Sequence, residues 1–324
     1  MRISHSKLKT FRRCHKEYDY KYNRNLRRKW KPKPLYIGSV LHLCIEYWVK
    51  GEKPWKAAIE EYRDKLKKLF VEERVEYEQY LDECESIFNG YIRMYSQSPL
   101  EYEYTELMIE VPIPDLKDFS IITIIDGIVK EDKRRYIMEH KNMSKIPDET
   151  NRMSDVQTAI YWWVLPLAGY PIPHGTIWDY LRTKPQAVPE VLKKGGLTKR
   201  KNIDTTWHTY KQAILDNGLD PKDYEDMREV LQGKDELFYR RVKVPFSQYM
   251  VDQLVLELKQ TAMVMSKLGH IVTDRNMTRD CPRCGYFNLC QAELRGHDTD
   301  YIIEKEYEVQ HDPKKKTPRK RNSQ

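Results

Sequence analysis

The segment "IIDGIVKEDKRRYIMEHKN", residues 124–142, carries the strongest structural signal in this chain. It holds two runs rich in apolar and β-branched residues, separated by the polar stretch 130–135. This pattern predicts two antiparallel strands joined by a turn. Side chains alternate between the two faces of a strand, so Glu139 and Lys141 project from the same face. Asp126 of the first strand then lies beside Glu139.

Two carboxylates and an ammonium at one point suit phosphodiester hydrolysis. Carboxylate oxygens bind Mg²⁺ or Mn²⁺, and a nearby lysine orients water or offsets charge at the scissile phosphate. Two alternatives stay open at this point. The Asp-Gly pair 126–127 favours a tight hairpin turn of its own. In addition, an E-x-K pair is weak evidence alone, because such pairs are frequent on exposed strands.

Three further residues extend this candidate site. Gln157 and Tyr161 are spaced i, i+4 in a predicted helix, so they share a face and can organise the site or bind DNA. Tyr161 also reads as a core aromatic. His42 lies in a predicted helix among apolar neighbours, where a histidine is usually a core residue, but its imidazole is also a potential metal ligand.

The remaining pattern predicts an α/β fold with a helical front, a central sheet and a cysteine-rich end. Its predicted helices are 5–22, one beginning near Gly38, two within 54–96, 153–169 and 247–268. Its further predicted strands are 106–113, 175–183 and 238–246.

Composition limits the class of protein. The chain has 324 residues, enough for one large domain or two ordinary ones. A charged fraction of 33% and the lack of a long apolar run argue against a membrane span. The N-terminus has no signal-peptide pattern, so we expect a cytoplasmic protein.

The formal net charge of +8 is concentrated in the clusters 23–33, 192–202 and 313–324. Such clusters fit a polyanionic partner, although the last one is equally consistent with a solvated, disordered tail. The segment after 185 also contains Trp207, His208 and Tyr210, which suit either a surface that guides a nucleic-acid strand or ordinary helix packing.

The stretch "CPRCGYFNLC", residues 281–290, places cysteines at 281, 284 and 290, one short of a four-coordinate metal site. In a cytosolic chain, such cysteines are metal ligands or buried thiols more often than disulfides. A set of four thiolates suits zinc or an iron–sulfur cluster. Cys44 and Cys84 fall within predicted amphipathic helices, so we expect them to be buried, inert thiols.

The order of these motifs resembles the RecB-like branch of the PD-(D/E)XK nuclease superfamily. The resemblance covers residues 4–290, and its motifs are "SHSKLKTFRRC" (4–14), G-x-x-x-H (38–42), Asp126, E-x-K (139–141) and Q-x-x-x-Y (157–161). It implies a divalent-metal site on His42, Asp126 and Glu139, a catalytic Lys141, and supporting roles for Gln157 and Tyr161. Ile125 replaces the superfamily's proline before the first acid.

The resemblance also implies an organisation. We expect a restriction-endonuclease-like core, in which helices flank a central mixed sheet, as a single nuclease domain over residues 1–300. Within it lie a helical insertion (54–100), a helical arm (185–237) and a cysteine staple (281–290). A basic, disordered tail is expected at 301–324.

For the cysteines, the resemblance implies a [4Fe–4S] cluster that ties the N-terminal helix to the end of the domain. Its ligands would be Cys14, Cys281, Cys284 and Cys290, as in the iron–sulfur nucleases of CRISPR adaptation and of AddB-type end resection. Zinc is the alternative occupant.

The function implied is a Mg²⁺- or Mn²⁺-dependent DNA nuclease, an exonuclease acting on ends or single strands in recombination, repair or replication. A stand-alone form of this kind suits a phage or mobile element in its host's cytoplasm. No G-x-x-x-x-G-K-[ST] motif is present, so a helicase, recombinase or other replication protein would be a separate partner. The alternatives are a retired nuclease fold that binds DNA or acts as a scaffold, and a zinc-stabilised nucleic-acid-binding module.

Overall fold

The computed structural model describes residues 1–69, 71–98, 100–147, 155–245 and 247–310. The chain divides into two compact units, each made of segments that are not continuous in the sequence. One, here called the cysteine unit, comprises 1–31, 110–123 and the chain from 248 onward; the other, the sheet unit, comprises 32–109 and 124–247. Each unit packs hydrophobic clusters of its own, which is the physical reason for the division.

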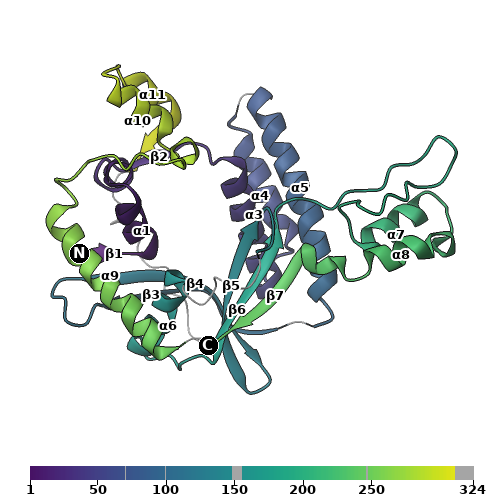
Figure 1. Cartoon of the computed structure of the whole chain (residues 1–324), viewed down its shortest axis with the longest axis horizontal. Helices are drawn as coiled ribbons and strands as arrows, with labels where there is room; N and C mark the ends of the chain where they lie inside the picture. The colour runs from purple at the N-terminus through teal and green to yellow at the C-terminus, as the bar shows by residue number, and fades with distance from the viewer. Residues whose placement is uncertain (70, 99, 148–154, 246, 311–324) are drawn as a thin grey trace. The chain divides into compact units, whose positions relative to one another are not determined.

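The sheet unit is built on strands β4 (Ser120–Glu131), β5 (Arg134–Met143), β6 (Gly175–Arg182) and β7 (Tyr239–Val244), paired in that order (Figure 1). β5 and β6 run parallel, whereas the pairs β4–β5 and β6–β7 are antiparallel. A parallel pair needs a crossover, and helix α6 (Val156–Leu167) provides it. The predicted α/β fold with a mixed sheet and flanking helices is therefore confirmed.

Three helices of the sheet unit pack against one another: α3 (Lys33–Lys50), α4 (Lys56–Leu66) and α5 (Val71–Tyr95). The last two are the helices expected within 54–96. α3 begins five residues before the predicted start, because the first helical turn accommodates a proline. Strand β3 (Glu101–Pro112) follows these helices and pairs with β4.

The segment between β6 and β7 forms the helical arm, with α7 (Trp207–Asp216), the 3₁₀ turn η3 (Pro221–Tyr224) and α8 (Glu225–Leu231). Figure 1 shows α7 and α8 projecting beyond the strands of this unit. The arm has its own hydrophobic cluster, which includes Leu197 and Tyr210. It is thus a small folded body rather than a loose loop.

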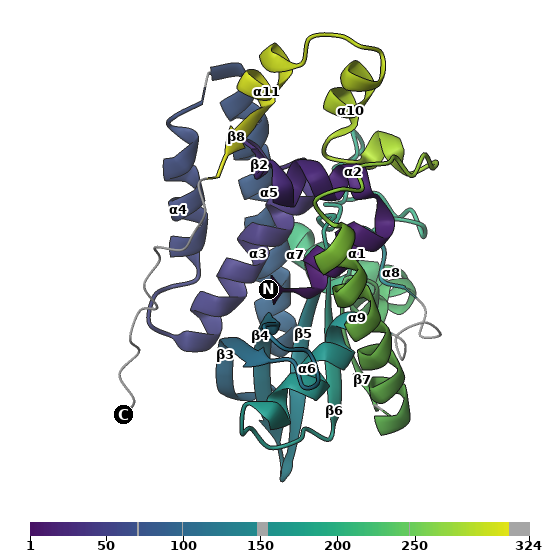
Figure 2. The ribbon, with the colours of Figure 1, turned by 90° about the vertical axis from the view of Figure 1, so that its left-hand side faces the viewer.

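The cysteine unit combines both ends of the described chain. Its elements are β1 (Arg2–Ile3), α1 (His5–Arg13), α2 (His15–Tyr18), the π-helical turn η1 (Asp19–Asn23), β2 (Leu26–Arg28), α9 (Gln248–Leu268), the 3₁₀ turn η5 (Cys281–Arg283), α10 (Phe287–Leu294), α11 (Asp300–Glu306) and β8 (Tyr307–Val309). β1 pairs with the beginning of β4, and α9 lies beside α1 (Figure 2).

The predicted tail begins too early. Residues 300–309 form α11 and β8, and β8 pairs antiparallel with β2 from Leu26↔Val309 to Arg28↔Tyr307. Tyr307 is buried and stacks on Tyr286, so an aromatic contact helps to hold this strand. Residues 311–324 lie outside the described part, and disorder there stays a prediction. None of the described helices has both the length and the apolar character needed to span a bilayer.

Candidate active site

The two strands that carry the acidic residues pair antiparallel, as predicted. Their pairing extends from Glu131↔Arg134 at the turn to Gly127↔Met138, and the turn itself lies at residues 132–133. The Asp-Gly pair therefore lies inside β4, and the alternative of a hairpin turn at that pair is wrong.

The pairing of β4 with β5 ends at Gly127, directly after the candidate site residue Asp126. Beyond Gly127, the backbone N–H of His140 donates to Oδ2 of Asp126 at 2.8 Å. This bond to a side chain replaces a bond between the two backbones. Glycine is required at 127 because a Cβ there would lie 2.7 Å from the ring of Tyr102. Asp126 is thereby held against β5, next to Glu139.

Glu139 and Lys141 begin a chain of polar contacts that leads into α6. The Lys141 ammonium forms an ion pair with Glu139 and donates to Oε1 of Gln157 at 3.0 Å. Nε2 of Gln157 in turn donates to the Tyr161 hydroxyl at 2.6 Å. Asp155 caps the first turn of α6 by accepting from the backbone N–H of residue 158, which positions the helix. The structure thus brings these predicted residues together.

A second group lies on the other side of Asp126. Potential ligand atoms of His42 on α3, Glu106 on β3 and Asp126 all lie within 4.8 Å of one another. Nδ1 of His42 is 4.0 Å from Oδ2 of Asp126. Glu139 is not a member of this group, so Asp126 stands between the His42–Glu106 side and the Glu139–Lys141 side.

Glu106 was not predicted as a site residue. It has a φ of 50°, in the left-handed region that non-glycine residues rarely occupy within a strand. Such strain persists where the surroundings enforce it, often at functional sites. Burial, and then the charge of Asp126, raise the pKa of Glu106 to about 7.

The carboxylate of Glu139 is buried and only partly neutralised by the protein. Burial and the charge of Asp126 raise the pKa of Glu139, despite its ion pair with Lys141. Only 2% of Glu139 is exposed, and its Oε2 has no hydrogen-bond partner among the described residues. A buried polar atom without a partner is costly, so this oxygen is suited to bind a cation.

These residues fit a divalent metal. Carboxylate oxygens from Glu106, Asp126 and Glu139 are the hard donors that Mg²⁺ and Mn²⁺ prefer. Burial lowers the pKa of His42, which favours the neutral imidazole that can bind a metal. Asp126 adjoins both groups, so these four residues are the ones that would hold the ion.

Replacing Glu106 by glutamine is expected to weaken Mn²⁺ binding at least tenfold. In the parent protein, Mn²⁺ affinity should rise as the pH increases through about 7, because the ion must displace the proton of Glu106. The variant should show a shallower rise. Calorimetric titration at several pH values between 6 and 8 measures both effects.

Glu103 provides the matched control, since it lies on the same strand but is paired with Arg135 and Lys130. Its replacement by glutamine should leave Mn²⁺ affinity unchanged. Equal affinities for the Glu106 variant and the parent would exclude Glu106 as a ligand.

A buried ionic network lies on the other face of β5. His140 Nδ1 is 2.8 Å from Oδ2 of Asp179 on β6, and the same oxygen accepts from the Tyr91 hydroxyl at 2.5 Å. Arg241 of β7 donates to Oδ1 of Asp179 at 3.2 Å. Burial opposes a charge on His140, but the bond to Asp179 outweighs it and raises the pKa of the imidazole.

The four cysteines of the predicted metal site come from two parts of the chain. Cys14 is in an extended break between α1 and α2, whereas Cys281, Cys284 and Cys290 belong to the η5–α10 region; all four are half-buried thiols. Cys44 and Cys84 are fully buried, and burial raises the pKa of both, as expected for inert thiols.

Asn276 contacts both the residue before Cys14 and the first cysteine of the staple, Cys281. The Asn276 side chain donates to the carbonyl of Arg13 at 2.9 Å, and its own carbonyl accepts from Sγ of Cys281 at 3.8 Å. The backbone N–H of Thr278 donates to the same sulfur at 3.3 Å. Within the described part of the chain, no three of these thiols lie within 4.8 Å of one another.

Two of the three ring-bearing residues singled out in the arm pack within its hydrophobic cluster. Tyr210 is fully buried in the arm's cluster, and Trp207 packs on it with stacked rings 6.1 Å apart. Only His208 is exposed. Helix packing therefore accounts for Trp207 and Tyr210.

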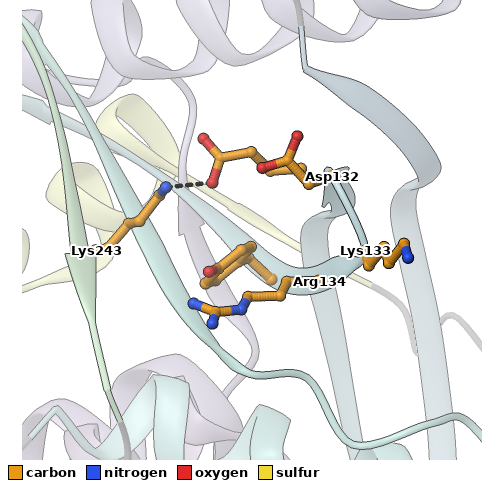
Figure 3. Close-up of a pocket in the computed structure, with 6 residues that line it drawn as sticks. Asp132, Lys133, Arg134 and Lys243 are labelled. Carbon is orange, nitrogen blue, oxygen red and sulfur yellow. Dashed lines mark hydrogen bonds and ion pairs between the residues drawn. The ribbon is translucent and has the colours of Figure 1, made fainter.

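An open hollow at the opposite end of β4 and β5 has no catalytic set. Its volume is about 510 Å³, and Figure 3 shows Asp132, Lys133, Arg134 and Lys243 around it. Lys243 is ion-paired with Glu131. This end of β4 is five residues, or roughly 16 Å, from Asp126, so the hollow is separate from the candidate site.

Comparison with known proteins gives a family match over most of the chain. A family model described as "PD-(D/E)XK nuclease superfamily" matches residues 2–291, a range that includes every candidate residue above. No curated protein matches the chain. A solved structure described as "Crystal structure of SSO0001" is 11% identical, with 90% of this chain and 87% of that chain covered and a TM-score of 0.33.

Proposed function

The chain belongs to the PD-(D/E)XK nuclease superfamily, and from this premise we propose that it is a divalent-metal-dependent DNA exonuclease of the RecB-like branch. The observation that carries the proposal is the Glu139–Lys141 ion pair beside Asp126, because Oε2 of Glu139 has no hydrogen-bond partner among the described residues. Superfamily membership supports metal-dependent hydrolysis and DNA binding. The resemblance of the motif order to the RecB-like branch supports action on DNA ends or single strands.

Each residue has a distinct role in the proposed reaction. A bound divalent ion supplies positive charge for the scissile phosphate and a nucleophilic water. Its proposed ligands are His42, Glu106, Asp126 and Glu139. Lys141 stays protonated, because Glu139 raises its pKa against the effect of burial. The ammonium therefore acts as a hydrogen-bond donor and charge stabiliser at the phosphate rather than as a base.

The supporting residues fix the direction of that ammonium. Gln157 accepts from Lys141 and donates to Tyr161, and the side chain of Tyr161 is buried. The lysine is thus held between one carboxylate and one amide. Such preorganisation lowers the cost of charge stabilisation in the transition state.

The test is hydrolysis of end-labelled linear DNA, single-stranded and duplex, with Mg²⁺ or Mn²⁺. We expect metal-dependent cleavage that chelation abolishes and that requires a free end, with a closed circular substrate as the control for end dependence. A protein that binds DNA but cleaves none of these substrates with either metal would be a retired nuclease fold. Cleavage of circles as fast as of linear DNA would contradict the exonuclease assignment.

The proposed nuclease also holds a [4Fe–4S] cluster on four thiols: Cys14, Cys281, Cys284 and Cys290. Three contacts support the link between Cys14 and the other cysteines. Cys281 makes one N–H···S and one S–H···O contact, and the Asn276 side chain donates to the carbonyl of Arg13. Four thiolates also suit zinc, so analysis of the bound metal separates the two occupants.

Protein purified without oxygen is therefore expected to contain iron and acid-labile sulfide in equal amounts, with broad visible absorption. Cys290→Ser should lose both and unfold more easily, because closing the long loop back to Cys14 stabilises the cysteine unit. Cys84→Ala, at a buried thiol outside the set, should keep the iron. Stoichiometric zinc without iron would contradict the cluster.

A further inference from the structure

The arm presents a short hairpin whose outer surface is both basic and apolar. An antiparallel bridge joins Val191 to Leu197, and Gly195 and Gly196 turn the chain with φ values of 84° and 81°. The Gly195 N–H donates to the carbonyl of Leu192 at 2.9 Å, which closes the turn. We refer to residues 188–201 as the arm hairpin.

One side of the arm hairpin is anchored in the arm. Leu197 is buried in the arm's hydrophobic cluster, and its N–H donates to the Tyr224 hydroxyl at 2.9 Å. Lys199 is ion-paired with Asp226 at 2.9 Å and lies over the ring of Tyr224. These contacts leave the opposite side of the hairpin directed at solvent.

The solvent side carries cations that have no partner. Lys193, Lys194, Arg200 and Lys201 are exposed, and none of their side chains makes an ion pair or hydrogen bond with any described residue. Glu190 is the only acidic residue in the arm hairpin. This concentration of unpaired positive charge fits a polyanion.

Aliphatic side chains lie among these cations. Val188, Val191 and Leu192 are exposed by 68%, 60% and 45% of their surface. Apolar side chains can contact the faces of bases, which a single strand exposes and a stacked duplex covers. The mixture of side chains therefore favours single-stranded nucleic acid over duplex.

The root of the arm lies at the catalytic end of β5. The N–H of Thr183, the first residue after β6, donates to the carbonyl of Met143 at 2.9 Å. Met143 is two residues, or roughly 7 Å, beyond Lys141 along β5. Arg182 and Asp204 brace this root with two parallel hydrogen bonds of 2.7 and 2.6 Å.

We propose that the arm hairpin binds single-stranded DNA as the strand passes the catalytic end of β5. The four unpaired cations contact phosphates, and the three aliphatic side chains contact exposed bases. This inference rests on the proposed nuclease function and adds a preference for single strands. Because all seven side chains are exposed, substituting them should not disturb the arm's core.

The test uses the full-length protein without divalent metal and a fluorescent 30-nucleotide single strand or 30-base-pair duplex. The arm variant carries Lys193→Gln, Lys194→Gln, Arg200→Gln and Lys201→Gln. We expect its affinity for the single strand to fall at least tenfold at moderate salt. The slope of log affinity against log salt should decrease by about 0.7 for each phosphate that the variant no longer neutralises, or about 3 in total.

A matched control removes four exposed, unpaired cations elsewhere: Lys9, Lys68, Lys117 and Lys133, each replaced by glutamine. It has the same net charge as the arm variant and should bind within twofold of the parent. Thermal unfolding of both variants should match the parent. A second variant, Val191→Ser with Leu192→Ser, should weaken single-strand binding severalfold and leave the salt slope unchanged.

The outcomes separate this inference from the proposed function. If the parent cleaves DNA and the arm variant binds the single strand as the control does, the arm hairpin does not bind the substrate and instead faces another partner. If the arm variant loses single-strand and duplex binding equally, the preference for single strands is overturned. A parent that neither binds nor cleaves DNA overturns the nuclease function itself.

Discussion

Replacing Lys141 by alanine is expected to reduce DNA hydrolysis about 10²- to 10³-fold, the loss typical of one preorganised charge donor in an active site. The ammonium contacts both Glu139 and Gln157, and no other described cation forms an ion pair with Glu139. DNA binding should change little, since only one cation of a long binding surface is removed. Single-turnover cleavage of a linear end-labelled strand, combined with binding measured without metal, separates the two effects.

Lys243→Ala is the matched control for that experiment. Lys243 is also a strand lysine paired with a glutamate, Glu131, but it lies at the hollow shown in Figure 3. Its loss should leave the cleavage rate unchanged. If Lys141→Ala cleaves as fast as this control, the active site has been placed wrongly.

Replacing Asp179 by asparagine is expected to lower the free energy of unfolding by about 3–5 kcal/mol, as is typical when one partner of a buried ion pair is removed. Asp179 is fully buried and accepts hydrogen bonds from Tyr91 and Arg241, besides its pairing with His140. Without its charge, the Arg241 guanidinium loses its counter-ion, and the His140 imidazole loses the carboxylate that raises its pKa. Chemical denaturation followed by circular dichroism measures the change.

Asp204→Asn tests whether burial of the ion pair causes the loss of stability expected for Asp179→Asn. Asp204 has equally good geometry, with two hydrogen bonds from Arg182, but 36% of its side chain is exposed. Exposed ion pairs contribute about 1 kcal/mol or less, so this variant should be much closer to the parent. Equal losses for both variants would show that the His140–Asp179 network has no special role in stability.

Local patterns in the sequence determined the strands and several site residues. The alternation of side chains in a strand requires Glu139 and Lys141 to share a face, and the i, i+4 spacing requires the same of Gln157 and Tyr161. These statements need only the chain's own periodicity. The structure bears them out with the Lys141–Gln157–Tyr161 contacts.

Other features depended on contacts between segments far apart in the chain. Glu106 lies in a polar strand where a carboxylate reads as solvent-exposed, and only its positive φ and the approach of His42 and Asp126 reveal it. Asp179 did leave a signal, a lone acid within the apolar run "GTIWDYLR". A buried acid needs a cationic partner, and no local pattern identifies Arg241, more than 60 residues later.

The sequence by itself therefore determined which residues share a face within each strand and helix, because covalent geometry repeats with a set period. The tertiary structure alone decided which faces meet: β8 against β2, Glu106 beside Asp126, and His140 bonded to Asp179. Such meetings depend on packing and on the satisfaction of buried charge over the whole unit. They follow from the balance of many long-range contacts, which no single segment encodes.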